Sequence, residues 1–177
     1  EQNPGLVRNV SKLKAKKERQ QQLLKSSYIE RDTRCVNNIL PGGYYLRPLV
    51  ESDATYVNSR WPFRSNKSLI MIQKQIIADN TNATKFDSNT CLGIEFDEQL
   101  VACIIRHRNG SIGILHVDEA HRRQNLGEIL LKEATDALAR RGEEIFAFIQ
   151  DGNKASEALF TKLGWEKANP LGKKGTG

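Results

Sequence analysis

The dipeptide Asn109-Gly110 lies between two apolar runs and is the feature that most limits what this chain can fold into. The run before it, "LVACIIRH", and the run after it, "SIGILHV", are rich in the β-branched residues that favour strands. Asn-Gly between two such runs is the strongest short-range signal for a two-residue hairpin, since a type I′ turn needs a positive φ at both central residues. The sequence therefore predicts an antiparallel strand pair joined by a type I′ turn.

Two strands and two helices are expected before this hairpin. "LPGGYYLRPL" indicates a turn and a strand, and "NTCLGIEF" a strand that meets a turn at Asp97-Glu98. The first helix starts at Ser52, a favourable N-cap, and stops before Pro62. The second helix is "NKSLIMIQKQIIADN", and its apolar residues share one face. Those residues are Leu69, Ile72, Ile76 and Ile77.

After the hairpin, a helix is expected over Gly127–Arg140, ended by Gly142. Its inward residues are Leu126, Ile129, Leu130, Ala134, Ala137 and Leu138. "EIFAFIQ" follows as a buried strand, and a last helix runs from about Lys154 to Leu163, with Gly164 after its end. The predicted order is β-α-α-β-β-β-α-β-α, which is an α/β fold with a mixed sheet.

Basic charge is concentrated in the first forty residues. Residues 1–40 carry nine Lys/Arg against four Asp/Glu, whereas residues 41–177 carry 18 against 17. The body of the chain is therefore not a basic nucleic-acid-binding surface. We expect residues 1–40 to be a basic helical leader or the remnant of an upstream lobe, with a weak apolar stripe at Leu24 and Tyr28. The Gly- and Lys-rich residues 169–177 are expected to form a flexible tail.

Cysteine usage and hydropathy narrow the class of protein. The three cysteines, at 35, 91 and 103, form no CxxC motif, so the sequence indicates neither a zinc-finger nor a thioredoxin-like site, and no metal is expected. Cys91 and Cys103 lie in apolar runs and are expected to be buried thiols in a reducing compartment. No apolar run is long enough to span a bilayer and no signal peptide is evident, so an intracellular location, cytoplasmic or mitochondrial, is expected.

Three segments resemble the GNAT superfamily of acyl-CoA N-acyltransferases. "HVDEAHRRQNLGEILL" is similar to the family's pyrophosphate loop, Arg/Gln-x-x-Gly-x-Gly/Ala, and "DGNKASEALFTKLGW" to its second CoA segment. "VNSRWPFRSNKSLIMIQKQI" is similar to the Trp-Pro-Phe region of the glycine N-acyltransferase-like (FR47-like) branch, whose members carry another lobe upstream. The resemblance covers residues 41–168 and implies a GNAT domain there, with a central mixed sheet and helices on both faces.

The resemblance implies a site for acyl-CoA at the loop before the third helix. A helix N-terminus offers unpaired N–H groups and a partial positive charge, which suit a pyrophosphate. Gly127 lets the backbone approach a phosphate closely, and Asn125 stands where the family usually has its first glycine. Asn is among the few other residues that tolerate a left-handed φ. The loop residues implied to bind CoA are Arg122, Arg123, Gln124, Asn125, Leu126, Gly127 and Glu128.

The rest of the implied CoA site comes from the preceding strand and from the second segment. The backbone of Leu115 to Val117 would run beside the pantetheine arm. In the family, a bulge in this strand splays it from the next one and aims an N–H at the thioester carbonyl, which stabilises the developing oxyanion. Asn153 would hydrogen-bond the pantetheine arm as well as cap its helix, and Ser156 and Phe160 would line the thiol end.

The proton-transfer groups of many relatives are absent. Where they have a glutamate base this chain has Ser111, which could at best hold a water, and where they have a tyrosine acid it has Phe160. His107, His116 and Glu95 are local substitutes for the base. A transferase can also work without a dedicated base, because positioning supplies much of the acceleration.

The resemblance implies an enzyme that moves an acetyl or larger acyl group from acyl-CoA to the amine of a small acceptor, such as glycine or another amino acid. Two alternatives stay open: an acetyltransferase of protein or polyamine amines, and a catalytically weak CoA-binding regulatory or interaction module. Neither a nucleic-acid partner nor a membrane span is expected, and the oligomeric state is left open.

Overall fold

The computed structural model describes residues 5–8, 40–83 and 89–167. The strands in these ranges are β1 Gly5–Arg8, β2 Tyr44–Pro48, β3 Leu92–Phe96, β4 Gln99–Arg106, β5 Ile112–Val117, β6 Phe146–Ile149 and β7 Glu166–Lys167. The α-helices are α2 Ala54–Arg60, α3 Asn66–Asn82, α4 Leu126–Arg141 and α5 Lys154–Lys162. Short 3₁₀ turns, η1 Glu51–Asp53 and η2 Glu119–His121, precede α2 and the loop before α4.

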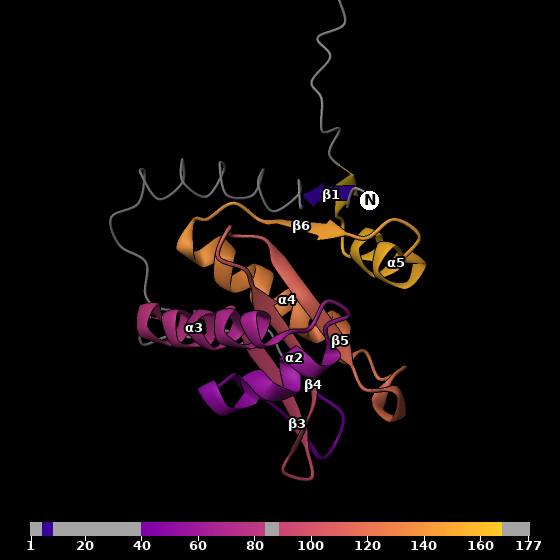
Figure 1. The fold of residues 1–177 in the computed structure, drawn as a ribbon. Helices are drawn as coiled ribbons and strands as arrows, with labels where there is room; N and C mark the ends of the chain where they lie inside the picture. The colour runs from indigo at the N-terminus through magenta and orange to yellow at the C-terminus, as the bar shows by residue number, and fades with distance from the viewer. Residues whose placement is uncertain (1–4, 9–39, 84–88, 168–177) are drawn as a thin grey trace, which may run out of the picture.

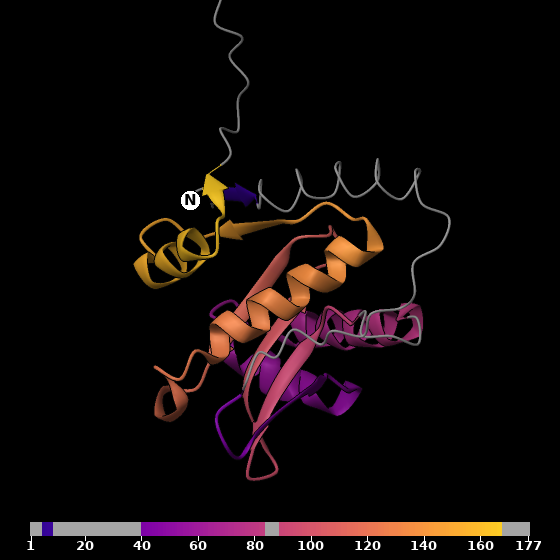
Figure 2. The same cartoon turned by 180° about the vertical axis from the view of Figure 1, so that it is seen from behind.

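The strands form one mixed sheet, and the helices cover both of its faces. The strand order is β2-β3-β4-β5-β6-β1-β7. Neighbours from β2 to β5 are antiparallel, while β5 and β6 are parallel. Helices α2 and α3 lie on one face and α4 lies across the other (Figures 1 and 2). The predicted α/β class, with a mixed sheet between helices, is confirmed.

Each face of the sheet has its own hydrophobic core, and the predicted inward face of α4 is confirmed. All six of its predicted residues, from Leu126 to Leu138, are buried. Gly142 ends the helix with a left-handed φ of 71°. The two cysteines within the described ranges, Cys91 and Cys103, are buried as expected, in the core under α2 and α3.

The type I′ turn occurs at Asp97-Glu98, not at Asn109-Gly110. Asp97 and Glu98 have positive φ values of 51° and 62°, and they connect directly paired strand residues. At the other hairpin only Gly110 has a positive φ, and the N–H of Gly110 donates to the carbonyl of His107. This is a longer loop with a glycine bulge. The Asn109 side chain fixes it by accepting hydrogen bonds from the N–H and the hydroxyl of Ser111.

Two details of the first helices also differ from the prediction. Ser52 is not an N-cap, because the 3₁₀ turn already includes it and the carboxylate of Asp53 accepts the N–H of Val50. Ile77 is 45% exposed, since the buried face of α3 passes through Ile76 to Asp79 instead.

The strand β1 was not predicted. It lies within the segment expected to be a helical leader, and it pairs antiparallel with β6 and with β7. Its sequence, "GLVR", is too short to carry a periodic signal, so the partner strands determine its conformation. The Leu24 and Tyr28 stripe, Cys35 and the predicted tail lie outside the described residues.

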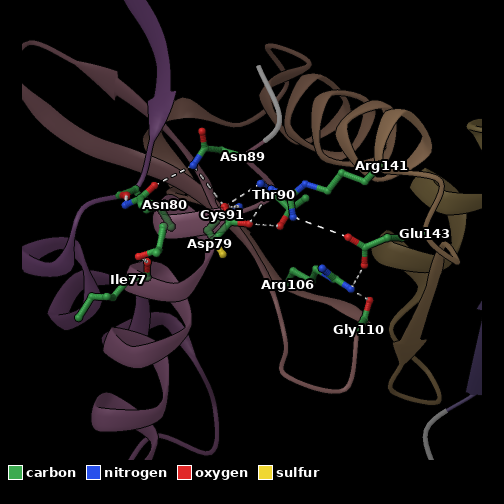
Figure 3. Close-up of polar contacts among 12 residues, drawn as sticks. Ile77, Asp79, Asn80, Asn89, Thr90, Cys91, Arg106, Gly110, Arg141 and Glu143 are labelled. Atoms are coloured by element: carbon green, nitrogen blue, oxygen red, sulfur yellow. Dashed lines mark hydrogen bonds and ion pairs between the residues drawn. The ribbon is translucent and has the colours of Figure 1, made fainter. Parts of the chain in front are cut away.

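The buried carboxylate of Asp79 connects the two helical layers (Figure 3). It accepts hydrogen bonds from the backbone N–H of Thr90 at 2.8 Å and of Cys91 at 2.9 Å, and from the Thr90 hydroxyl at 2.6 Å. The guanidinium of Arg141, the last residue of α4, lies 3.3 Å from the same carboxylate. Asp79 therefore fixes the end of α3 to the entry of β3 and to the end of α4. 

We predict that Asp79→Asn destabilises the protein by about 3 kcal/mol, because it removes one partner of a buried ion pair and directs amide hydrogens at other donors. Urea unfolding followed by circular dichroism measures this change. The matched control is Asp97→Asn in the exposed type I′ turn, where asparagine is equally favourable. Similar stabilities for the two variants would contradict a clamping role for Asp79.

Candidate functional site

The loop between β5 and α4 presents an uncapped helix N-terminus. Asn125 has a left-handed φ of 61°, which confirms that asparagine keeps the conformation of a glycine there. Arg123, two residues earlier, is also left-handed. The side chain of Asn125 makes no capping hydrogen bond. The first bond inside the helix runs from the N–H of Ile129 to Asn125, so the amides of residues 126–128 have no partner within the helix.

Packing within the protein does not require a glycine at position 127. A Cβ there would lie 3.6 Å from Leu159 and 3.6 Å from Val117, which is ordinary van der Waals contact. Its position in the first turn of α4 also needs no positive φ. Gly127 therefore fits a role in which its backbone approaches a ligand, and the exposed Arg122 and Arg123 give the loop the charge that suits an anion.

The second predicted segment packs beside this N-terminus. Lys162 of α5 donates to the carboxylate of Glu128 at 2.6 Å, and this hydrogen bond is the main reason that the pKa of Glu128 is lowered. The negative charge of Glu128 is thus partly neutralised next to the loop. The structure therefore brings the two sequence segments together through Glu128 and Lys162 and around Gly127.

The residues of α5 have local structural roles. The Asn153 side chain accepts the N–H of Ser156, so its predicted role as the N-cap is confirmed. Phe160 is 5% exposed, and its ring packs against that of Trp165 with centroids 4.7 Å apart. The roles of Asn153, Ser156 and Phe160 toward a ligand stay predictions.

The strand β5 contains the bulge that the resemblance implies. Cys103 pairs with His116 and Ile105 with Gly113, so β5 has one more residue than β4 between these pairs. Ile114, within the bulge, has a φ of 48°, which is strained for a β-branched residue. β5 pairs with β6 only at Ile112, and the β6-facing edge of residues 115–117 has no strand partner in the described chain. Such an edge suits hydrogen bonding to an extended ligand.

The polar residues near the bulge lie on the face that α2 covers. Cys103 and Ile105 belong to the core under α2 and α3, and residues paired across a ladder share a face. Gly113 and His116 therefore also face α2, whereas Leu115 and Val117 pack with the core under α4. The face of β5 toward α4 is thus apolar, and the face toward α2 carries titratable groups.

His107 lies directly over Gly113, next to the bulge. A Cβ on Gly113 would be 2.2 Å from Nε2 of His107, so the ring occupies the space that a side chain would need. The ring of Trp61 lies 6.1 Å away, between centroids. Burial lowers the pKa of His107 from its ordinary value of 6.5, so the imidazole is neutral at pH 7 and able to accept a proton.

His116 is bound to a carboxylate. Its Nε2 lies 3.1 Å from Asp118, which also accepts from the guanidinium of Arg60 at 3.1 Å. Burial lowers the pKa of His116 although Asp118 opposes this shift. The sequence did not indicate the Asp118–Arg60 pair, because the two residues are 58 positions apart.

The other two candidates for proton transfer are engaged elsewhere. Ser111 is 2% exposed and its hydroxyl donates to Asn109 in the hairpin loop. Glu95 in β3 accepts from Arg47 at 2.6 Å. Of the sequence-predicted candidates for proton transfer, His107 and His116 both lie on the α2-facing side of β5, His107 over Gly113 and His116 opposite Cys103.

Within the described ranges, no three His, Cys, Asp or Glu side chains group as metal ligands would. The helices of the same part of the chain include none with the length and apolar character needed to cross a membrane.

The comparisons with known proteins agree on one fold. The model of the FR47-like protein family matches residues 92–171. A Drosophila protein of known X-ray structure is 29% identical, with a TM-score of 0.60 over 73% of this chain. The chain spans 41% of the length of that Drosophila protein. A search of curated proteins finds no match.

Two acetyltransferases of known structure share the fold at lower identity. Arabidopsis thaliana Naa50, in complex with the bisubstrate analogue CoA-Ac-MVNAL, is 17% identical with a TM-score of 0.55, over 72% of this chain and 85% of its own. The ribosomal-protein-S18-alanine N-acetyltransferase of Escherichia coli is 19% identical with a TM-score of 0.51, over 71% and 79%.

We predict that Gly113→Ala moves the His107 ring out of its buried position, because the new Cβ would overlap Nε2. The pKa of His107 should then rise toward 6.5, since burial is what lowers it. An NMR titration of the histidine ring protons measures this shift. Gly127→Ala is the matched control and should leave the His107 titration unchanged, as its Cβ meets only ordinary contacts. A His107 titration unaffected by Gly113→Ala would show that the ring does not depend on this glycine.

Proposed function

We propose that the chain is an acyltransferase of the GNAT superfamily, since the FR47-like family model matches residues 92–171, and that it transfers an acyl group from acyl-CoA to the amine of a small acceptor. Glycine or another amino acid is the acceptor class that we propose. The observation that carries the proposal is the continuous path from the bulge in β5 to the uncapped N-terminus of α4. This path offers backbone donors both to a thioester and to a pyrophosphate.

The loop before α4 fits the phosphates of acyl-CoA. Residues 126–128 supply amide donors, Arg122 and Arg123 supply positive charge, and Gly127 puts no side chain between its own backbone and a ligand. The edge of Leu115 to Val117 has no strand partner in the described chain, although the Val117 carbonyl accepts from Nε of Arg122; it leads from this loop toward the bulge and would hold the pantetheine arm. Asn153, Ser156 and Phe160 of the neighbouring segment would complete the site.

His107 is the residue that we propose as general base. Acyl-CoA supplies a thioester whose carbonyl carbon is attacked by a neutral amine. His107 lies beside the bulge and is neutral at pH 7, so it would accept the proton that the attacking amine loses. His116 lies three residues after Gly113, closer to the phosphate loop, and Asp118 occupies its Nε2. His107 is therefore the better placed of the two.

A CoA-binding module without efficient catalysis is the second candidate function. Two observations favour it: the Ser111 hydroxyl is committed to the hairpin loop, and Phe160 has no hydroxyl with which to protonate a leaving thiolate. Mass spectrometry of reactions that combine acetyl-, benzoyl- and longer acyl-CoAs with amino acids, polyamines and peptides distinguishes the functions. An acylated amino acid supports the proposal, acylated peptides or polyamines favour an acetyltransferase of those amines, and tight CoA binding without any product favours the module.

We predict that Gly127→Val weakens CoA binding at least tenfold, whereas Gly127→Ala weakens it less, because a larger side chain hinders the approach of a phosphate to the backbone at this position more than a methyl group does. Isothermal titration calorimetry with CoA measures both affinities. Thermal melts of the two variants serve as the control, since neither change overlaps the protein near Cβ. An unchanged CoA affinity in Gly127→Val would remove this loop from the proposed site.

We predict that His107→Gln lowers kcat more than tenfold and leaves CoA affinity unchanged, since a general base contributes about 10²–10⁴-fold. The wild-type rate should rise with pH as the imidazole loses its proton, and the midpoint should lie below 6.5 because burial lowers the pKa of His107. Steady-state kinetics measured at a series of pH values give this rise in rate and its midpoint. His116→Gln is the comparison: a larger loss there would identify His116 as the base, and no loss in either variant would mean that no dedicated base exists.

A further inference from the structure

The loop before α4 has a conformation that its own sequence does not favour. Arg123 and Asn125 both have left-handed φ values, of 65° and 61°. This region of φ/ψ space is unfavourable for residues other than glycine, and asparagine tolerates it better than arginine does. Contacts with other parts of the molecule must therefore hold the loop in this shape.

Tyr44 of β2 makes such contacts on both sides of Arg123. Its hydroxyl lies 2.9 Å from Nδ1 of His121 and accepts a hydrogen bond from Nε2 of Gln124 at 2.9 Å. One hydroxyl can serve both partners, because it has one donor and two acceptor sites. The residues that it joins are 77 and 80 positions away along the chain.

The position of the Tyr44 hydroxyl is fixed by the packing of its ring. Tyr44 is 8% exposed and pairs with Phe96 across β2 and β3. The two rings are 4.7 Å apart between centroids, and the ring of His121 packs against both, at 5.7 Å and 5.3 Å. The loop is thus fixed by the cluster of the Tyr44, Phe96 and His121 rings, and by two hydrogen bonds that both involve the Tyr44 hydroxyl.

We infer that Tyr44 is a positioning residue for the acyl-CoA site. The inference rests on the proposed function, in which the amides of residues 126–128 bind the phosphates of acyl-CoA. By fixing His121 and Gln124, Tyr44 sets the path of the backbone that leads into these amides before any ligand arrives. Preorganisation of this kind lowers the cost of ordering a site on binding. Tyr44 acts through the loop and does not touch the reacting atoms.

Tyr44→Phe tests this role, because it keeps the ring and removes the hydroxyl. In the ligand-free protein, amide hydrogen exchange of residues 119–128 should become faster, while exchange in α3 stays the same. Loss of the two hydrogen bonds should weaken CoA binding about three- to tenfold in calorimetry. In steady-state assays KM for acetyl-CoA should rise and kcat should stay the same, a split that general destabilisation would not produce.

The matched control is Tyr45→Phe, the neighbouring residue on the opposite face of β2. Tyr45 is 68% exposed, so removal of its hydroxyl should leave exchange, CoA affinity and KM unchanged. If Tyr44→Phe lowers the melting temperature strongly, His121→Phe is the second variant: it keeps an aromatic ring in the cluster, removes only the hydrogen bond to Nδ1, and should give the same changes at smaller size. 

Unchanged exchange in residues 119–128, or faster exchange with unchanged CoA affinity, would overturn the role of Tyr44. Failure of the wild-type protein to bind CoA would instead overturn the proposed function, and this inference with it. The wild-type titration therefore separates the two failures.

Discussion

The single extra residue in β5 opposite Ile104 is the constraint on which the arrangement of the site depends. Side chains alternate between the faces of a strand, so an inserted residue reverses the assignment of every residue after it. Without the insertion, His116 would point into the apolar core under α4, and Leu115 and Val117 would face α2. With the insertion, Leu115 and Val117 complete that core. His116 then shares a face of β5 with Gly113, over which the His107 ring lies. The strained φ of Ile114 is the local cost of this arrangement.

Features that depend on near neighbours in the chain were predictable. The inward face of α4, its end at Gly142 and the cap of α5 at Asn153 follow from helical periodicity and terminal residues, and the structure contains each of them. The turn types were not predictable from the dipeptides alone. Asn109 uses its side chain to bind Ser111, which favours a longer loop, while direct pairing of Phe96 with Gln99 leaves only two residues to turn, at Asp97-Glu98. The register of the strands decided each turn, and no dipeptide encodes the register.

Features that join distant segments were missed for a common reason. β1 pairs with strands at the other end of the chain, Asp79 binds Arg141 62 positions away, and Tyr44 binds Gln124 80 positions away. None of these residues stands out by type or spacing in a single sequence. The bulge leaves only a weak signal in the sequence. Ile112, Leu115 and Val117 all face α4, whereas strict alternation along a strand would place Ile112 on the opposite face from Leu115 and Val117. The resemblance supplied the bulge where the pattern alone did not.

In the loop before α4, most of the groups that control shape are not the groups that supply positive charge. Arg122 and Arg123 are exposed, and such charges attract an anion while remaining solvated. Shape comes from the Tyr44 hydroxyl, the aromatic cluster around His121, the left-handed Asn125 and one contact of Arg122, whose Nε donates to the Val117 carbonyl at 3.2 Å. This division has a physical advantage, because a cation that had to fix the loop through an internal ion pair would have less of its charge available to a phosphate. Glu128 fits the same logic, since Lys162 neutralises the one carboxylate in the first turn of α4 and so preserves the positive potential of that helix end.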